Sequence, residues 1–213
     1  MTIPIFIFDS EEKWFPVGVE ESLSAVGVKI PNPSTPSGRL DFPQYMKPPD
    51  LPPVGYQRSV FGGNLWWDQR WLWYPYNSWN IGGVGEHEGD WEFVQIGHAD
   101  QKLTKPVLIT GSQHHSGEAK LEWTVTHQGN RPVIFVARGS HANYFAPFRN
   151  LDDRCDGQGQ ALKDITWRSF GTWVDWKGQW GNSTGEGKSP MSPKMQGMRW
   201  HSPHLYHSRA RAT

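Results

Sequence analysis

The chain has 213 residues, which is enough for one domain with a substantial core. Its 21 basic and 21 acidic residues balance, so no net charge favours nucleic acid or an anionic membrane as a partner. The single cysteine, Cys155, excludes a disulfide within these residues and is typical of a reducing compartment. No signal peptide and no transmembrane segment are predicted, so we expect a cytoplasmic protein.

The first quarter of the chain predicts a strand, a short helix and a long connection. The apolar residues 3–8 predict the strand, and Pro16 begins a helix that ends at Ala25, before Gly27. The Pro-rich residues 31–53 predict an extended connection that wraps over the surface.

Five further segments alternate or concentrate apolar residues as strands do, with glycine or proline between them: residues 71–76, 90–96, 106–113, 121–127 and 132–137. The 13 tryptophans, 23 glycines and 17 prolines favour a turn-rich β architecture over a helical bundle. Residues 178–213 predict an irregular C-terminal segment. We therefore predict one domain over residues 1–213, a mainly β, antiparallel β-sandwich with long Pro/Gly-rich loops and one or two short helices.

The motif at residues 85–92, Gly-Glu-His-Glu-Gly-Asp-Trp-Glu, predicts a cation site. In a strand, Asp90 and Glu92 project to one face and Trp91 to the other, while His87 can fold back from the preceding turn. Two such carboxylates repel each other unless a cation, a shared proton or a basic side chain lies between them. A hard divalent cation (Mg²⁺, Ca²⁺ or Mn²⁺) is the simplest solution, because it prefers oxygen ligands.

An ordinary ion-pair network is the alternative for the same motif. In that interpretation Arg138 or a lysine holds Asp90 or Glu92, and His87 is hydrogen-bonded. The common zinc motifs and Cys-x-x-Cys are absent, which makes a structural zinc improbable.

Two other clusters follow predicted strands, where loops often carry function. The first contains His114, for which a hydrogen-bonded surface loop is the plainer interpretation. The second is residues 138–144, in which His141 is a ligand or an acid/base candidate and Arg138 a partner for a carboxylate. Ser140 is next to His141 in sequence, which is poor geometry for a nucleophile and its base, and the Gly-x-Ser-x-Gly elbow is missing.

Several motifs together resemble the vacuolar protein sorting-associated protein 62 family over most of the chain: residues 12–16, 73–77, 89–92, 136–144 and 176–181, followed by Trp200. A more distant similarity is to the necrosis- and ethylene-inducing-peptide-like proteins, which are secreted cytolysins with a β-sandwich fold. Their motif has the spacing His-x-x-Asp-x-Glu that His87, Asp90 and Glu92 reproduce. That resemblance implies a divalent cation used for lipid-headgroup binding, with Asn77 at the position of a further acidic ligand.

We expect a cation-dependent enzyme, with hydrolysis, elimination and cyclisation left open. Asp90 and Glu92 would hold the metal with His87 and Asn77, and His141 or His114 would move protons. Arg138 would orient an anionic group, and the substrate would contact a further set of side chains: Trp71, Trp73, Trp79 and Ser140. The first alternative is a non-catalytic module in which the cation bridges a glycan or lipid headgroup. The second is a structural protein whose ion stiffens a loop.

Overall fold

The computed structural model describes residues 2–41, 50–80, 82, 84–113, 116–149, 153–183, 189–209 and 211–212. His114 and residues 42–49 of the predicted Pro-rich connection lie outside the described residues.

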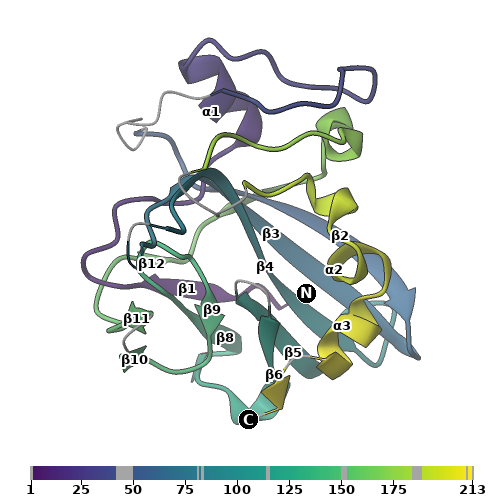
Figure 1. Cartoon of the computed structure of the whole chain (residues 1–213). Helices are drawn as coiled ribbons and strands as arrows, with labels where there is room; N and C mark the ends of the chain where they lie inside the picture. Colours follow the sequence, from purple (N-terminus) through teal and green to yellow (C-terminus); the bar gives the residue numbers. More distant parts are fainter. Residues whose placement is uncertain are drawn as a thin grey trace.

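The central layer is a seven-stranded sheet with the order β13-β2-β3-β4-β5-β6-β14 (Figure 1). The pairs from β2 to β6 are antiparallel, and the two outer pairs are parallel. The strands of this sheet span the following residues: β2 Val54–Gly62, β3 Leu65–Asn77, β4 His87–His98, β5 Pro106–Gln113, β6 Ser116–Leu121, β13 Thr166–Arg168 and β14 Arg211–Ala212.

A second sheet packs against one face of the central sheet, in the order β12-β1-β8-β7, with β9 also paired to β8. Its strands are β1 Ile5–Phe8, β7 His127–Gln128, β8 Arg131–Val136, β9 Asn143–Tyr144 and β12 Ala161–Leu162. A separate two-stranded sheet is formed by β10 Phe148–Arg149 and β11 Arg154–Cys155. The predicted mainly β sandwich is confirmed.

The described residues contain three short α-helices, more than the one or two predicted: α1 Val19–Ala25, α2 Met198–His201 and α3 Pro203–Arg209. Three 3-10 helices accompany them: η1 Glu122–Thr124, η2 Thr172–Asp175 and η3 Pro193–Met195. Helix α1 and the C-terminal segments lie over the other face of the central sheet (Figure 1). No helix in the described part of the chain has the length and apolar character needed to cross a membrane.

Strand alternation places one hydrophobic core on each face of the central sheet. Trp71 and Trp73 of β3 face the layer formed by α1 and the C-terminal segments, together with Trp91 of β4. Leu72 and Tyr74, the alternate residues of β3, face the second sheet. The first core contains six of the 13 tryptophans as buried indoles: Trp71, Trp73, Trp91, Trp173, Trp176 and Trp180.

Two elements differ from the sequence prediction. Strand β2 was not predicted, although it forms a hairpin with β3 across the Gly63–Asn64 turn. The predicted strand at residues 121–127 is instead the end of β6 followed by η1. The chain turns there because the Thr124 hydroxyl donates to the Leu121 carbonyl (2.8 Å) and the Val125 amide donates to the Glu122 carbonyl (3.3 Å).

Gly89 makes the closest backbone approach in β4. Its φ is +64°, and a Cβ atom there would lie 2.2 Å from the carbonyl oxygen of Trp180. Gly129 has nearly the same φ, +66°, but open space around it. We therefore expect Gly89→Ala to lower the free energy of unfolding by roughly 2 kcal/mol more than Gly129→Ala, because only the first adds a backbone clash to the φ strain. Urea unfolding of both variants measures this difference, and equal losses would contradict the packing described here.

Candidate functional site

A buried cluster of charged side chains lies at one end of β3 and β4. The Nδ1 atom of His141 is 2.9 Å from Oδ2 of Asp90, and its Nε2 atom is 3.8 Å from Oε1 of Glu12. His141 has no exposed surface, and both carboxylates are more than nine-tenths buried. The ring of His141 also stacks on Tyr74, with centroids 3.8 Å apart and planes 2° from parallel. The imidazole is thus fixed on two edges and one face.

The backbone around His141 is held in an unusual conformation to reach this position. His141 has a φ of +54° and Gly139 a φ of +74°, within a turn closed by the Ala137 amide bonding to the Ala142 carbonyl (2.9 Å). A left-handed φ at a non-glycine residue costs free energy, and such strain persists where the surroundings compensate for it. Here the contacts with Asp90 and Glu12 provide that compensation.

Glu12 connects this turn to the loop that follows β1. Its Oε1 accepts hydrogen bonds from the backbone amides of Lys13 (2.8 Å) and Trp14 (2.7 Å), and its Oε2 accepts one from the amide of Gly139 (2.6 Å). Burial raises the pKa of the Glu12 carboxyl, but the nearby positive charge of His141 and the hydrogen bonds from these amides outweigh burial and lower it overall. Glu12 is therefore a carboxylate, and its charge faces His141.

His141 is held as a cation by the two acids. Burial by itself would lower its pKa, but the hydrogen bond with Asp90 and the negative charges of Asp90 and Glu12 outweigh burial and raise the pKa to about 9. A buried carboxylate is stable only when it is paired and hydrogen-bonded. The imidazolium of His141 supplies that pairing for Asp90.

The predicted metal ligands have other partners in this arrangement. The Nδ2 group of Asn77 donates to Asp90 (3.2 Å), while its Oδ1 accepts from the Trp79 amide (2.9 Å). These two contacts of opposite kind fix the orientation of the Asn77 amide, so its oxygen does not face Asp90. Nδ1 of His87 bonds to the Gly89 carbonyl (2.7 Å). Two N–H groups therefore face the Asp90 carboxylate, Nδ2 of Asn77 and Nδ1 of His141, and a metal cation at the same place would repel both.

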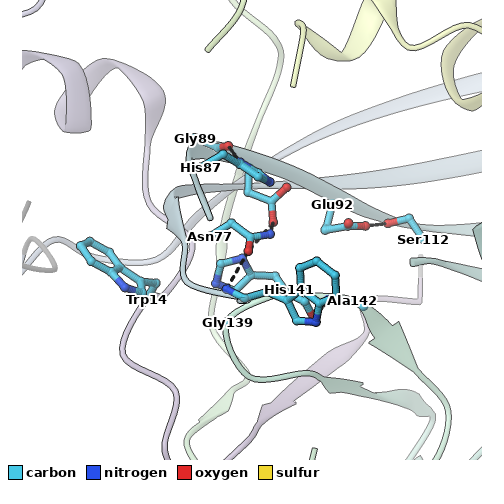
Figure 2. A network of polar contacts seen from close by, with 12 residues as sticks. Trp14, Asn77, His87, Gly89, Glu92, Ser112, Gly139, His141 and Ala142 are labelled. Atoms are coloured by element: carbon cyan, nitrogen blue, oxygen red, sulfur yellow. Dashed lines mark hydrogen bonds and ion pairs between the residues drawn. The ribbon is translucent and has the colours of Figure 1, made fainter. Parts of the chain in front are cut away.

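Glu92 does not join Asp90 at a common point. Its carboxylate accepts a hydrogen bond from the Ser112 hydroxyl and turns away from His141 (Figure 2). Among the described residues, no group of three His, Cys, Asp or Glu side chains is arranged to hold a metal ion. The residues present thus do not fit the predicted divalent cation in this geometry.

The other predicted site residues lie in three different environments. Trp71 and Trp73 have no exposed surface and belong to the core, because they occupy the face of β3 that packs against the C-terminal layer. Ser140 is also fully buried, and its hydroxyl donates to Asp153 (2.9 Å). Arg138 is half-exposed and pairs with Glu11 rather than with Asp90. Of the predicted substrate-contacting side chains, Arg138 and the half-buried Trp79 are accessible to a ligand.

A pocket of about 620 Å³ adjoins the buried cluster. Glu12, a member of the cluster, and Gly139 form part of its lining. Two indoles, those of Trp14 and Trp79, also line it, and Trp14 packs on Tyr76 with ring centroids 5.3 Å apart. Gly139 permits this shape, since a Cβ there would lie 2.8 Å from Oγ of Ser78.

The pocket is lined by equal numbers of acidic and basic side chains. Its acidic members are Glu11, Glu12 and Asp153, and its basic members are Lys13, Arg138 and Arg154. Arg154 pairs with Glu11 (2.8 Å) and with Asp9 (3.1 Å), which holds the rim of the pocket. The pocket therefore offers many hydrogen-bonding groups but no net charge.

Sequence reasoning missed Glu12 as the partner of His141 and missed Trp14 and Arg154 as pocket residues. A glutamate and an indole in a loop carry no local signal of this role. Glu12 and Gly139 are 127 residues apart in the chain, and only the packing of the loop after β1 against the turn after β8 joins them.

The architecture is that of the toxin-fold β-sandwiches, a class of fold shared with necrosis- and ethylene-inducing proteins. The chain is similar to the non-toxic HaNLP3 protein (15% identity, TM-score 0.57, covering 100% of this chain and 89% of that one). It is also similar to Necrosis and Ethylene inducing Protein 2 from the causal agent of cocoa's Witches Broom disease (15% identity, TM-score 0.53, covering 100% of this chain and 89% of that one).

A third similar protein, NLPPya, has been solved in complex with mannosamine (12% identity, TM-score 0.54, covering 99% of this chain and 87% of that one). Its complex with glucosamine matches at 14% identity and a TM-score of 0.52, covering 81% of this chain and 74% of that one. At these identities the likeness shows the fold alone.

No protein-family model matches the chain, and no curated protein matches it. The resemblance to the vacuolar protein sorting-associated protein 62 family therefore has no support from these comparisons, whereas the distant similarity to the toxin-fold proteins extends to the whole architecture.

Proposed function

We propose that the protein is a non-catalytic binding module whose pocket takes a polyhydroxylated ligand of monosaccharide size, with an amino sugar as the leading candidate. The observation that carries this proposal is the pocket lined by Trp14 and Trp79 and by balanced acidic and basic groups. Its volume of about 620 Å³ lies within the range of roughly 300–1,000 Å³ that is usual for small-molecule sites.

The chemistry of the lining suits a sugar better than an anionic headgroup. A sugar ring has apolar C–H faces that pack on an indole, and its hydroxyls need both donors and acceptors. Ser78 and Asn80 are exposed beside the half-buried Trp79 and offer such groups. An ammonium substituent gains further from an indole face and from the rim carboxylate of Glu11. The three acidic and three basic side chains leave no excess positive charge to select a phosphate.

The complexes of NLPPya with glucosamine and mannosamine support the ligand class, because they place amino sugars on a protein of the same fold. The pocket chemistry of this chain is an independent argument for the same class.

The same geometry argues against turnover. A general acid or base must come within hydrogen-bond reach of the substrate. His141 has no exposed surface, and both of its nitrogens face carboxylates. Ser140 is buried as well, and its hydroxyl is bonded to Asp153. His114, the other proton-transfer candidate, lies outside the described residues.

The experiment is a calorimetric titration of the protein with glucosamine, with glucose and inorganic phosphate as comparison ligands. We expect saturable binding that is strongest for glucosamine, weaker for glucose and absent for phosphate. Trp79→Ala should weaken glucosamine binding at least about tenfold, or roughly 1.4 kcal/mol. Trp123→Ala is the matched control, because Trp123 is 64% exposed and does not line the pocket.

Three results would overturn the proposal. These are the absence of saturable sugar binding, equal affinities of the Trp79→Ala variant and the unaltered protein, and chemical conversion of the sugar followed by NMR. The last result would restore the enzymatic interpretation.

A further inference from the structure

A second pocket lies at the end of the second sheet that is opposite the proposed sugar pocket. Its lining includes Ile3, which precedes β1, and Arg131, the first residue of β8. The sugar pocket is lined instead by Glu12, which follows β1, and by Arg138, which follows β8. Because β1 and β8 are parallel, the two pockets are separated by the length of β8, which is roughly 17 Å for its six residues.

We propose that this second pocket binds a small organic carboxylate. We call it the Arg131 pocket and define it by six of its lining residues: Ile3, Arg131, Lys163, Asp164, Ile165 and Trp167.

Arg131 brings a fixed guanidinium to the pocket. Its Nε donates to the carbonyl oxygen of Ile3 (2.7 Å), and its Nη2 donates to those of Pro4 (3.1 Å) and Lys163 (2.7 Å). These bonds use every N–H of Nε and Nη2, so Nη1 keeps two N–H groups that have no partner among the described residues. A guanidinium that is already held in place loses little freedom when a ligand binds to Nη1.

The indole of Trp167 adds a second donor to the same pocket. Its Nε1 atom is buried and has no hydrogen-bond partner among the described residues. A buried N–H group without an acceptor costs free energy, so such groups are rare unless water or a ligand satisfies them. The Nε1 atom of Trp91 also has no partner there, but Trp91 lies in the tryptophan-rich core, whereas Trp167 lines a pocket. An acceptor bound in the Arg131 pocket satisfies the N–H of Trp167.

Packing fixes the ring of Trp167 and with it the direction of this donor. The guanidinium carbon of Arg70 lies 4.8 Å from the ring centroid, and Arg70 is itself buried in a salt bridge with Asp68 (2.7 Å). Trp167 pairs with Gly55 between β13 and β2, and a Cβ atom at Gly55 would overlap the Cζ3 atom of the ring. The indole therefore rests against the bare backbone of β2 and is held there by Arg70.

The charges of the lining favour a ligand with one negative charge. Arg131 and Lys163 are basic and Asp164 is acidic, and none of the three forms a salt bridge with a described residue. Guanidinium, ammonium and indole N–H groups only donate hydrogen bonds, and a carboxylate only accepts them. The surplus of one positive charge matches a monocarboxylate rather than a phosphate dianion.

The remaining lining suits the organic part of such a ligand. Ile3 and Ile165 contribute apolar surface beside the indole of Trp167. The volume of about 430 Å³ lies within the range of roughly 300–1,000 Å³ that is usual for small-molecule sites. A carboxylate carried on a small apolar group therefore matches both the donors and the size of the pocket.

The test is an NMR titration of the ¹⁵N-labelled full chain with benzoate, followed through the indole N–H signals of its 13 tryptophans. The signal that is missing from the spectrum of Trp167→Phe identifies Trp167. We expect benzoate to shift this signal saturably. Benzamide, which is neutral and has the same ring, should leave it nearly unchanged.

Two variants test the assigned donors by calorimetry with benzoate, after thermal unfolding has shown that each is folded. Trp167→Phe should weaken binding about tenfold, because it keeps a packed ring and removes an N–H that donates to a charged group. Lys163→Gln should weaken binding about threefold, as expected for one exposed charge. Lys102→Gln is the matched control, because Lys102 is also exposed and does not line the pocket. Arg131 is kept in every variant, since its bonds to three carbonyls also stabilise the fold.

A Trp167 signal that does not respond to benzoate would overturn the proposal. An equal response to benzamide, or equal affinities of Lys163→Gln and Lys102→Gln for benzoate, would overturn it as well. A larger response to phenyl phosphate than to benzoate would replace the carboxylate by a phosphate ester and so contradict the ligand class. Trp79→Ala separates this proposal from the sugar proposal, because Trp79 lines only the sugar pocket of the two. That variant should bind benzoate as the unaltered protein does, and glucosamine should leave the Trp167 signal in place.

Discussion

His141→Ala should lower the free energy of unfolding by about 3–5 kcal/mol. The substitution removes the cation that faces two buried carboxylates, those of Asp90 and Glu12, and an unpaired buried charge is among the most costly changes to a folded protein. It also removes the ring that stacks on Tyr74. Urea unfolding at pH 7 measures the loss. His201→Ala is the matched control: His201 is exposed, and we expect a change within about 0.5 kcal/mol.

A second variant covers the case in which His141→Ala does not fold. In His141→Gln/Asp90→Asn the charge of Asp90 is removed together with its partner, so only Glu12 remains unpaired. We expect this double variant to be more stable than His141→Ala. If it is less stable, or if His141→Ala costs no more than His201→Ala, the buried ion-pair cluster does not have the energetic role described here.

Stability should fall as the pH rises from about 6.5 to about 9. The pKa of His141 is raised to about 9 in the folded protein, whereas an unfolded histidine has its ordinary value near 6.5. The stabilising contribution of the protonated ring is therefore complete below pH 6.5 and is lost as the pH rises through 9. The shift corresponds to about 3 kcal/mol. Urea unfolding at a series of pH values measures the decline.

His141→Gln provides the control for this pH dependence, because a glutamine at this position does not titrate. The decline between pH 6.5 and 9 should be absent in that variant. At acid pH the unaltered protein should also lose stability, since the lowered pKa of Glu12 gives a contribution that is present above about pH 4.5 and lost as the pH falls. An identical alkaline decline in both proteins would assign it to other groups.

The fold could be predicted from local patterns where these were strong. Alternation along β4 predicted that Asp90 and Trp91 face opposite sides, and the structure places Trp91 in the tryptophan-rich core and Asp90 against His141. The segment at residues 106–113 predicted β5 with the observed bounds. Strand β2 was missed, although Gly63-Asn64 between two segments with apolar residues was a hairpin signal.

The site could be predicted only in part, because its essential contacts are long-range. The sequence indicated that the charge at Asp90 needs a partner, and it left open whether that partner is a metal cation or a basic side chain. His141 is 51 residues further along the chain, and nothing local indicated that a left-handed turn would direct its ring at Asp90. Similarly, Trp14 and Trp79 line the pocket because the loop after β1 lies beside the loop after β3, whereas Trp71 and Trp73 of β3 are buried.

Thermal unfolding with Ca²⁺, Mg²⁺ or Mn²⁺ and with a chelator tests most directly whether His141, rather than a captured ion, balances Asp90. With an imidazolium 2.9 Å from the Asp90 carboxylate, the melting temperature should be the same in all four conditions. A melting temperature that rises with one of these ions and falls with the chelator, and that no longer responds in Asp90→Asn, would contradict the account.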